Sequence, residues 1–180
     1  MKEIDIRPAT ESDFEAMWAI FRELVASGDT YVFTPDTPKH VCYDYWFGPG
    51  VTSHVATMGR ERLLGMYKLL PNQQGLGAHV ANASFMVSPA AQGVGIGMLL
   101  GQHCLDTARA AGYLAMQFNF VVSSNLSAVS LWKKLGFAIV GTLPKAFQHR
   151  RLGYVDAYVM YQQLSDPADW PEADAGAPRP

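Results

Sequence analysis

Three glycines at alternate positions, Gly93, Gly95 and Gly97, occupy the junction between a strand-like and a helix-like segment. The run from Ala78 to Val87 is typical of a strand that ends before Pro89, and the apolar residues that follow the junction recur at helical spacing. Glycine lets a backbone turn tightly and approach a ligand closely. The start of the next helix offers unpaired N–H groups to an anion such as phosphate. The junction is therefore either a phosphate-binding turn or a plain tight turn.

Composition predicts one globular domain. The chain has 180 residues, 49% of them hydrophobic and 17% charged, with a formal net charge of −2. A chain of this length can bury enough surface to form a stable core without disulfides or structural metals. The near-neutral charge disfavours a nucleic-acid binder. We expect a domain over residues 1–164 and a tail over 165–180 that is rich in proline, alanine and acids.

Two cysteines, Cys42 and Cys104, lie far apart and form no CxxC pair. A disulfide framework or a zinc ribbon is therefore disfavoured, and reduced thiols are typical of the cytoplasm. The sequence shows neither a signal-peptide core nor an apolar run long enough to cross a bilayer. We expect a cytoplasmic protein without a membrane partner. The motifs HExxH and GxSxG are also absent, which disfavours metal and serine-hydrolase chemistry.

Hydrophobic periodicity predicts an α/β or α+β fold with a mixed sheet of about seven strands and four helices. The first helix begins near the capping box Thr10–Asp13 and ends at Ser27–Gly28. The last two strands, 137–143 and 154–161, flank a loop that contains Pro144 and Arg150–Arg151. The other strands are expected at 4–8, 53–58, 63–70, 78–87 and 116–122, and the other helices at 39–47, 96–111 and 128–135.

Two common phosphate-binding motifs do not fit the glycine turn. A P-loop requires GxxxxGK followed by Ser or Thr, and no lysine follows here. A Rossmann fingerprint requires a third glycine where this chain has Met98, and an acidic residue about 20 positions further on, where the chain has Ala115-Met116-Gln117. Both motifs are therefore disfavoured.

The spacing Gln92-x-x-Gly95-x-Gly97 resembles the Q/R-x-x-G-x-G/A signature of the GNAT superfamily of N-acetyltransferases. Residues 125–137, Asn-Leu-Ser-Ala-Val-Ser-Leu-Trp-Lys-Lys-Leu-Gly-Phe, resemble the family's N-x-x-A-x-x-L-Y-x-x-x-G-F helix. Both motifs stand in the family's order, and the expected elements match along nearly the whole chain. The resemblance implies an acyl-CoA N-acyltransferase fold with splayed central parallel strands.

A narrower resemblance covers residues 77–83, 117–122, 141–147 and 153–157, which are similar to the GNAT group that acetylates proline analogues such as azetidine-2-carboxylate. It implies transfer of an acetyl group from acetyl-CoA to the amine of a small molecule or amino acid, by direct attack on the thioester and without a metal. Dimers are frequent in the family, so a homodimer is also expected. Two other hypotheses stay open, namely a non-catalytic acyl-CoA sensor and an acetyltransferase for protein lysines or N-termini.

The resemblance also implies where acetyl-CoA binds. In the family it lies in a V-shaped opening between two splayed strands, here 83–87 and 116–121. Backbone groups around Met86 and Val87 would pair with the pantetheine arm, and one of these amides would stabilise the oxyanion. Pyrophosphate would be held by the turn that begins at Gly93, with the amides of Val94, Gly95, Ile96, Gly97 and Met98, and by the side chain of Gln92.

Two positions of the second motif raise questions of role. Trp132 replaces the tyrosine that donates a proton to the leaving thiol in much of the family. Indole N–H is not a useful acid, but a thiol with a pKa of about 8.5 can leave as thiolate unaided. Acid catalysis is thus in doubt, whereas acetyl transfer is not. Asn125 precedes a helix, and it either caps that helix or contacts CoA.

Polar side chains in apolar strands are the candidates for the acceptor site. Asn82 and Asn119 interrupt strand-like runs where asparagine is depleted. They either make local turn or β-bulge bonds or orient the acceptor beside the thioester. His79 and Asp156 are the candidates for a base or an acceptor contact, each with an ordinary structural alternative. The aromatic segment from Tyr31 to Phe47 either closes a narrow acceptor site or packs beneath a loop.

Overall fold

The computed structural model describes residues 4–59 and 62–171. These residues form a mixed sheet of seven strands in the order β1-β2-β3-β4-β5-β7-β6, which confirms the predicted fold class. Neighbouring strands are antiparallel, except that β4 and β5 are parallel. The strands are β1 (Ile4–Pro8), β2 (Thr52–Met58), β3 (Arg62–Pro71), β4 (Val80–Val87), β5 (Ala115–Val122), β6 (Ala138–His149) and β7 (Gly153–Gln163).

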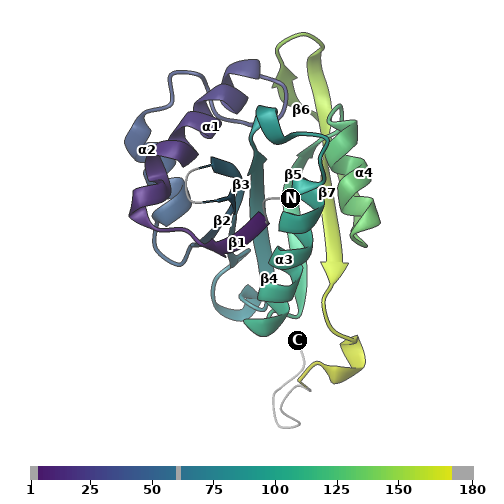
Figure 1. The fold of residues 1–180 in the computed structure, drawn as a ribbon. Helices are drawn as coiled ribbons and strands as arrows, with labels where there is room; N and C mark the ends of the chain where they lie inside the picture. The colour runs from purple at the N-terminus through teal and green to yellow at the C-terminus, as the bar shows by residue number, and fades with distance from the viewer. Residues whose placement is uncertain (1–3, 60–61, 172–180) are drawn as a thin grey trace.

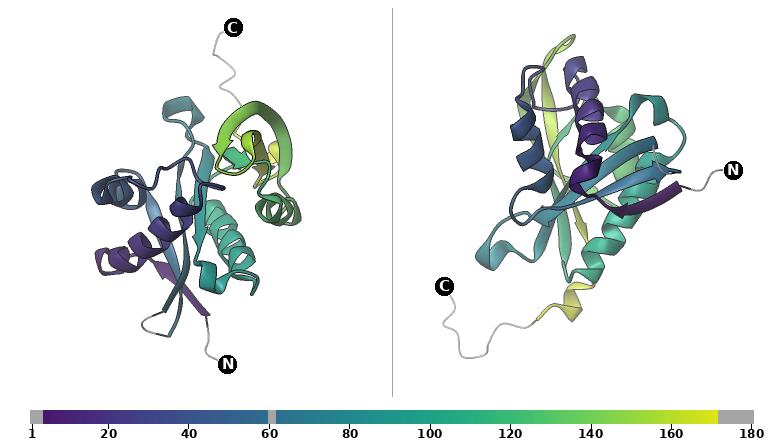
Figure 2. Two further views of the ribbon diagram at one scale, coloured as in Figure 1. Left: turned by 90° about the horizontal axis from the view of Figure 1, so that it is seen from above. Right: turned by 60° about the vertical axis from the view of Figure 1, so that its left-hand side comes forward.

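Four α-helices within the described residues cover the two faces of the sheet (Figure 1). Helices α1 (Phe14–Ser27) and α2 (Lys39–Phe47) lie on one face, and α3 (Ile96–Ala110) and α4 (Leu126–Lys134) lie on the other (Figure 2). Each face has its own buried cluster, and β3 contributes to both because its side chains alternate. Met66 packs with α1 and α2, whereas Tyr67 packs on the side of α3.

The predicted capping box before α1 is confirmed. Thr10 and Asp13 form the capping box at the short 3-10 turn Glu11–Asp13. Arg7 on β1 donates two hydrogen bonds of 2.8 and 2.7 Å to the Asp13 carboxylate. The Arg7 guanidinium lowers the pKa of Asp13 to about 2. The cap thus ties the first helix to the first strand.

Strand β6 is longer than predicted. It continues through Pro144 to His149, and the predicted end at Leu143 was therefore wrong. Pairing with β7 is irregular between Leu143 and Phe147, and Lys145 adopts a φ of 52° there. Proline is tolerated because β6 is an edge strand, where a missing N–H removes no ladder bond. Arg150 lies in the tight turn after the strand, as expected.

The parallel strands β4 and β5 separate soon after they begin. Their register contains only the pairs Val80–Ala115 and Ala81–Met116. Further along, β5 has an irregular register with β7 between Phe118 and Val121. The predicted splay of the central strands is thereby confirmed, and this opening is the main interruption in the sheet.

Beyond β7 the chain makes a short 3-10 turn, Pro167–Asp169, and the indole N–H of Trp170 donates to Ser165 Oγ at 3.1 Å. Residues 172–180 of the predicted tail and residues 60–61 of the turn between β2 and β3 lie outside the described residues. Among the helices of the described part, none is long and apolar enough to cross a membrane.

Candidate active site

A cavity of about 250 Å³ opens where β4 and β5 separate. The loop after α1, helix α2, the two strands and the start of α4 all contribute to its wall. Its polar lining consists mainly of amide and hydroxyl side chains, and its apolar lining is largely aromatic. The lining residues are Thr30, Tyr31, Val32, Phe33, Tyr45, Asn82, Ala83, Ser84, Phe85, Phe118, Asn119, Phe120, Val121, Val122, Asn125, Ala128 and Trp132.

A second cavity, of about 520 Å³, adjoins the first. The two share Tyr31, Val32 and Phe33, and the second extends to Phe147 and Arg150 at the hairpin of β6 and β7. The loop after α1 is therefore the partition between them. The predicted aromatic segment both packs and lines the site, since Phe33 packs against Phe21, with the ring centres 5.0 Å apart, and also lines both cavities.

Beyond Ala81 the backbone of β4 presents a free edge to the opening, that is, an edge that pairs with no neighbouring strand. The Tyr31 hydroxyl donates to the carbonyl of Phe85, whereas the Ser88 N–H donates to Leu64 on β3 at 2.9 Å. Successive residues of a strand direct their backbone groups to opposite edges. Phe85 and Val87 therefore face the splay, and Met86 faces β3.

This alternation corrects the role expected of Met86. Its backbone pairs with Met66 in the β3–β4 ladder, and its side chain is 1% exposed in the core beneath α1 and α2. The sequence located the correct segment but not which alternate residues direct their backbone groups to the opening. Nothing local indicates which edge of a strand is already paired. Val87 retains its predicted place, and Phe85 takes the place of Met86.

The glycine turn is open to solvent and has a backbone that favours glycine. Gly93 has a φ of 78°, and Gly95, the N-cap of α3, has a φ of 88°. A Cβ added to either would meet nothing within 4 Å, so the space in front of the helix N-terminus is free. Position 97 favours glycine for a different reason, because a Cβ added there would lie 3.1 Å from Leu131 Cδ2 on α4.

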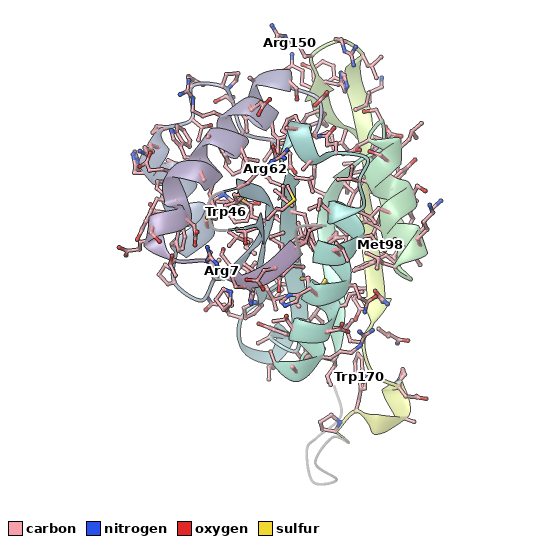
Figure 3. The ribbon with its side chains drawn as sticks, viewed as in Figure 1. Arg7, Trp46, Arg62, Met98, Arg150 and Trp170 are labelled. Carbon is pink, nitrogen blue, oxygen red and sulfur yellow. The ribbon has the colours of Figure 1, made fainter. Side chains whose placement is uncertain are left out.

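The side chains around this turn point outward. Gln92 is exposed, Val94 is 70% exposed and Met98 is 37% exposed. Met98 lies at the start of α3, on the side of α4 (Figure 3). The first N–H groups of α3 and the positive end of its dipole are thus available to an anion.

Trp132 forms an aromatic wall of the first cavity. Its ring centre lies 4.7 Å from that of Phe85 and 4.8 Å from that of Phe118, and the residue is 8% exposed. Asn125 caps α4, since its Oδ1 accepts from the Ala128 N–H at 3.2 Å. It also lines the cavity, so capping leaves a contact with CoA open.

Asn82 and Asn119 both line the cavity, and each side chain hydrogen-bonds to a residue distant in sequence. Asn82 Nδ2 donates across the opening to the Gln117 carbonyl at 2.8 Å. Asn119 lies at the irregular part of β5, where its Nδ2 donates to Asn72 Oδ1 and its Oδ1 accepts from Gln117 Nε2, each at 2.7 Å. These bonds fix the orientation of two amides at the mouth of the splay.

A buried lysine and its neighbours were missed by the sequence analysis. Lys68 is 7% exposed, and its Nζ lies 3.3 Å from the centre of the Tyr45 ring. Desolvation lowers the pKa of Lys68 to about 8. The Tyr45 hydroxyl donates to Ser84 Oγ at 2.6 Å, and burial raises the pKa values of Tyr45 and Tyr31. A cation within the apolar run Tyr67–Leu70 was the signal available in the sequence.

His79 and Asp156 are not among the residues that line the cavity. His79 lies where β4 and β5 are still joined, with its carbonyl accepting from Leu114, and its ring centre is 5.7 Å from that of Trp170. Trp170 lies at the end of the molecule opposite Arg150 (Figure 3). The Asp156 carboxylate accepts from the Lys145 N–H at 2.8 Å and so fixes the irregular part of β6. The structure brings neither of them to the acceptor side.

The family pattern described as "Acetyltransferase (GNAT) family" matches residues 15–137 of this chain. The chain belongs to the GNAT acetyltransferase family. A GCN5-related N-acetyltransferase from Kribbella flavida is 41% identical, with a TM-score of 0.85 over 89% of this chain and 97% of that one.

Two further GNAT-fold or N-acetyltransferase proteins are similar to this chain. A phosphinothricin acetyltransferase from Sinorhizobium meliloti, solved in complex with AcCoA, has the same fold, with a TM-score of 0.81 at 23% identity over 96% of this chain and 94% of that one. N-acetyltransferase aca1 of Schizosaccharomyces pombe is 36% identical over 101 residues, which are 56% of this chain and 48% of aca1. The match therefore spans about half the length of that curated relative.

The site geometry fits acetyl-CoA as the co-substrate. The open turn at Gly93 and Gly95 suits a pyrophosphate, and the free edge of β4 at Phe85 and Val87 suits the amides of a pantetheine arm. Among residues 4–59 and 62–171, no group of three or more His, Cys, Asp or Glu side chains that could hold a metal ion is found.

Proposed function

We propose that this GNAT chain is an acetyl-CoA-dependent N-acetyltransferase that acetylates the amine of a small molecule or amino acid. The observation that carries the proposal is the cavity at the splay. One side of this cavity is the free backbone edge of β4, and the other side is a set of oriented amides and aromatic rings. A carbonyl and an amine can meet there at a fixed distance from the glycine turn.

The main chain holds and activates the thioester. The N–H groups of Phe85 and Val87 face the opening, and one of them donates to the thioester oxygen as negative charge develops on it. The amides from Val94 to Met98, in the glycine turn and the first turn of α3, bind the pyrophosphate. Gln92 and Asn125 contact the cofactor from either side of the opening.

When bound, acetyl-CoA supplies a thioester whose C–S bond breaks as the acceptor nitrogen forms the new C–N bond, and CoA leaves as thiolate. The proton lost by the acceptor nitrogen passes to water at the open side of the cavity. Trp132 packs against Phe85 and excludes water from the leaving sulfur without donating a proton. Asn82 and Asn119 orient the acceptor amine toward the carbonyl.

The acceptor proposed is an amino acid or a proline analogue that enters past Tyr31. The four sequence strings that resemble the azetidine-2-carboxylate group support this choice, and so does the partition that Tyr31, Val32 and Phe33 form between the two cavities. We further propose that the enzyme is cytoplasmic and that it forms a homodimer. Residues 1–164 would be the catalytic domain.

Incubation of the purified protein with acetyl-CoA and an amine panel tests this function. The panel contains azetidine-2-carboxylate, phosphinothricin, common amino acids and lysine peptides, and the readouts are release of CoA thiol and the mass of the product. We expect the mass of a small acceptor to increase by one acetyl group. Tight acetyl-CoA binding with no turnover on any acceptor would favour the sensor hypothesis, and acetylation of peptides alone would favour a protein substrate.

A further inference from the structure

Lys68 carries a positive charge into the layer between the sheet and α2. The residue is 7% exposed, and its Nζ lies over the Tyr45 ring at 3.3 Å from the ring centre. Within the described residues, neither the ion pairs nor the side-chain hydrogen bonds include Lys68. A ring face interacts with only part of an ammonium group, which has three N–H donors. Burial removes part of the water around this charge, and an anionic partner would compensate that loss.

The first cavity is separated from this ammonium by one layer of side chains. Lys68 on β3 is directly opposite Ser84 on β4, so their side chains lie next to each other on the same face of the sheet. Ser84 lines the cavity and accepts from the Tyr45 hydroxyl at 2.6 Å, and Tyr45 lines it too. Asn82 lies two residues before Ser84, on the same face of β4.

We propose that Lys68 is a specificity-determining residue that selects acceptors carrying a carboxylate beside the reactive amine. The carboxylate lies against Ser84 and Tyr45, in front of the ammonium, and the amine then faces the thioester beside Asn82. This inference rests on the proposed acetyl transfer and names the residue that selects the acceptor for it.

Electrostatics sets the size of the effect. At an effective dielectric constant of about 20, two opposite charges with one layer of side chains between them attract strongly enough to change binding by tenfold or more. An uncharged amide in place of the carboxylate gains none of this attraction. Burial lowers the pKa of Lys68 to about 8, and the acceptor's negative charge would raise that pKa again, because it favours the charged form.

The test compares acid and amide forms of one acceptor. We expect wild-type enzyme to prefer azetidine-2-carboxylate over its carboxamide by tenfold or more in kcat/KM. In Lys68→Met the value for the acid should fall by at least tenfold, mainly through KM, while the value for the carboxamide stays within about twofold. Lys68→Arg keeps the charge and should retain most of the preference. Lys134→Met, at an exposed lysine of α4, is the matched control and should change neither value.

Different failures have different meanings. If Lys68→Met loses activity on the acid and the carboxamide equally, Lys68 is only structural and the proposal is wrong. An unchanged acid-to-amide ratio in an active Lys68→Met enzyme would also overturn the proposal, while leaving acetyl transfer intact. If wild-type enzyme turns over no acceptor of the panel, both the proposed function and this inference fail. Should Lys68→Met not fold, Lys68→Gln provides the same comparison.

Discussion

The two sides of the opening between β4 and β5 present different kinds of chemical group. On the side of α3, the polar groups that face the opening belong mainly to the main chain, at Phe85 and Val87 and at the turn containing Gly93 and Gly95. On the side of α2, the facing groups are side chains such as Asn82, Ser84 and Tyr45. Main-chain contacts tolerate most substitutions except at glycine, whereas side-chain contacts can be changed one residue at a time. Cofactor binding and acceptor choice should therefore be separable by mutation.

The largest effect on cofactor binding alone is expected at the glycine turn. Gly95→Val places a branched side chain at a φ of 88° and fills the space before the N-terminus of α3. We expect affinity for acetyl-CoA to fall by about thirtyfold or more in calorimetry. Gly112→Val is the matched control, because Gly112 follows the other end of α3 with a φ of 82° and equally open space. It should lose stability but keep its affinity, and an equal loss of affinity in both variants would refute the phosphate-binding role.

The opposite effect, a loss of acceptor turnover without a loss of cofactor affinity, is expected at Asn82. Asn82→Ala removes the bond to the Gln117 carbonyl and one oriented amide. Acceptor kcat/KM should fall by about tenfold to a hundredfold, while affinity for acetyl-CoA changes less than threefold, as measured by steady-state kinetics and calorimetry. Asn72→Ala, which removes a partner of Asn119 outside the cavity lining, should have the smaller effect. A loss of acetyl-CoA affinity at Asn82 as large as at Gly95 would break the comparison.

The buried charge on the acceptor side should also appear in stability. Burial lowers the pKa of Lys68 to about 8, below the value of about 10.4 in an unfolded chain. Between these two values the unfolded chain binds more protons, so stability rises with pH. The cost of burying the charge is complete below pH 8 and disappears as pH approaches 10.4. Urea denaturation should therefore show the difference in unfolding free energy, Lys68→Met minus wild type, to be larger at pH 7 than at pH 10. A difference independent of pH would show that the ammonium is not desolvated.

The smallest effect is expected at Trp132, which lies on the boundary between the two sides. Trp132→Tyr introduces a phenol where much of the family has one. If the thiolate leaves unaided, kcat should change by no more than about twofold and its pH profile should keep its shape. A tenfold increase in kcat would show that the missing acid limits the reaction.

The sequence predicted the side built from main chain better than the side built from side chains. The glycine spacing, the strand before it and the helix after it are local patterns, and each was found in place. The phase of β4 was missed at Met86, because the choice of edge depends on pairing with β3. The extension of β6 past Pro144 was missed as well, since only the sheet order reveals that β6 is an edge strand.

On the acceptor side, the asparagines were found because asparagine is rare in strands, and both line the cavity. His79 and Asp156 had no comparable signal of position, and long-range packing put them elsewhere. The group formed by Lys68, Tyr45 and Ser84 joins three separate elements, β3, α2 and β4. No periodicity in the chain encodes such a contact.

Residue-resolved amide exchange tests most directly the claim that acetyl-CoA binds along the free edge of β4. The N–H groups of Phe85 and Val87 face the opening, whereas that of Met86 is paired with β3. We predict that acetyl-CoA slows exchange at Phe85 and Val87 by tenfold or more and leaves the already slow Met86 unchanged. Equal protection of all three residues, or of none, would contradict the account.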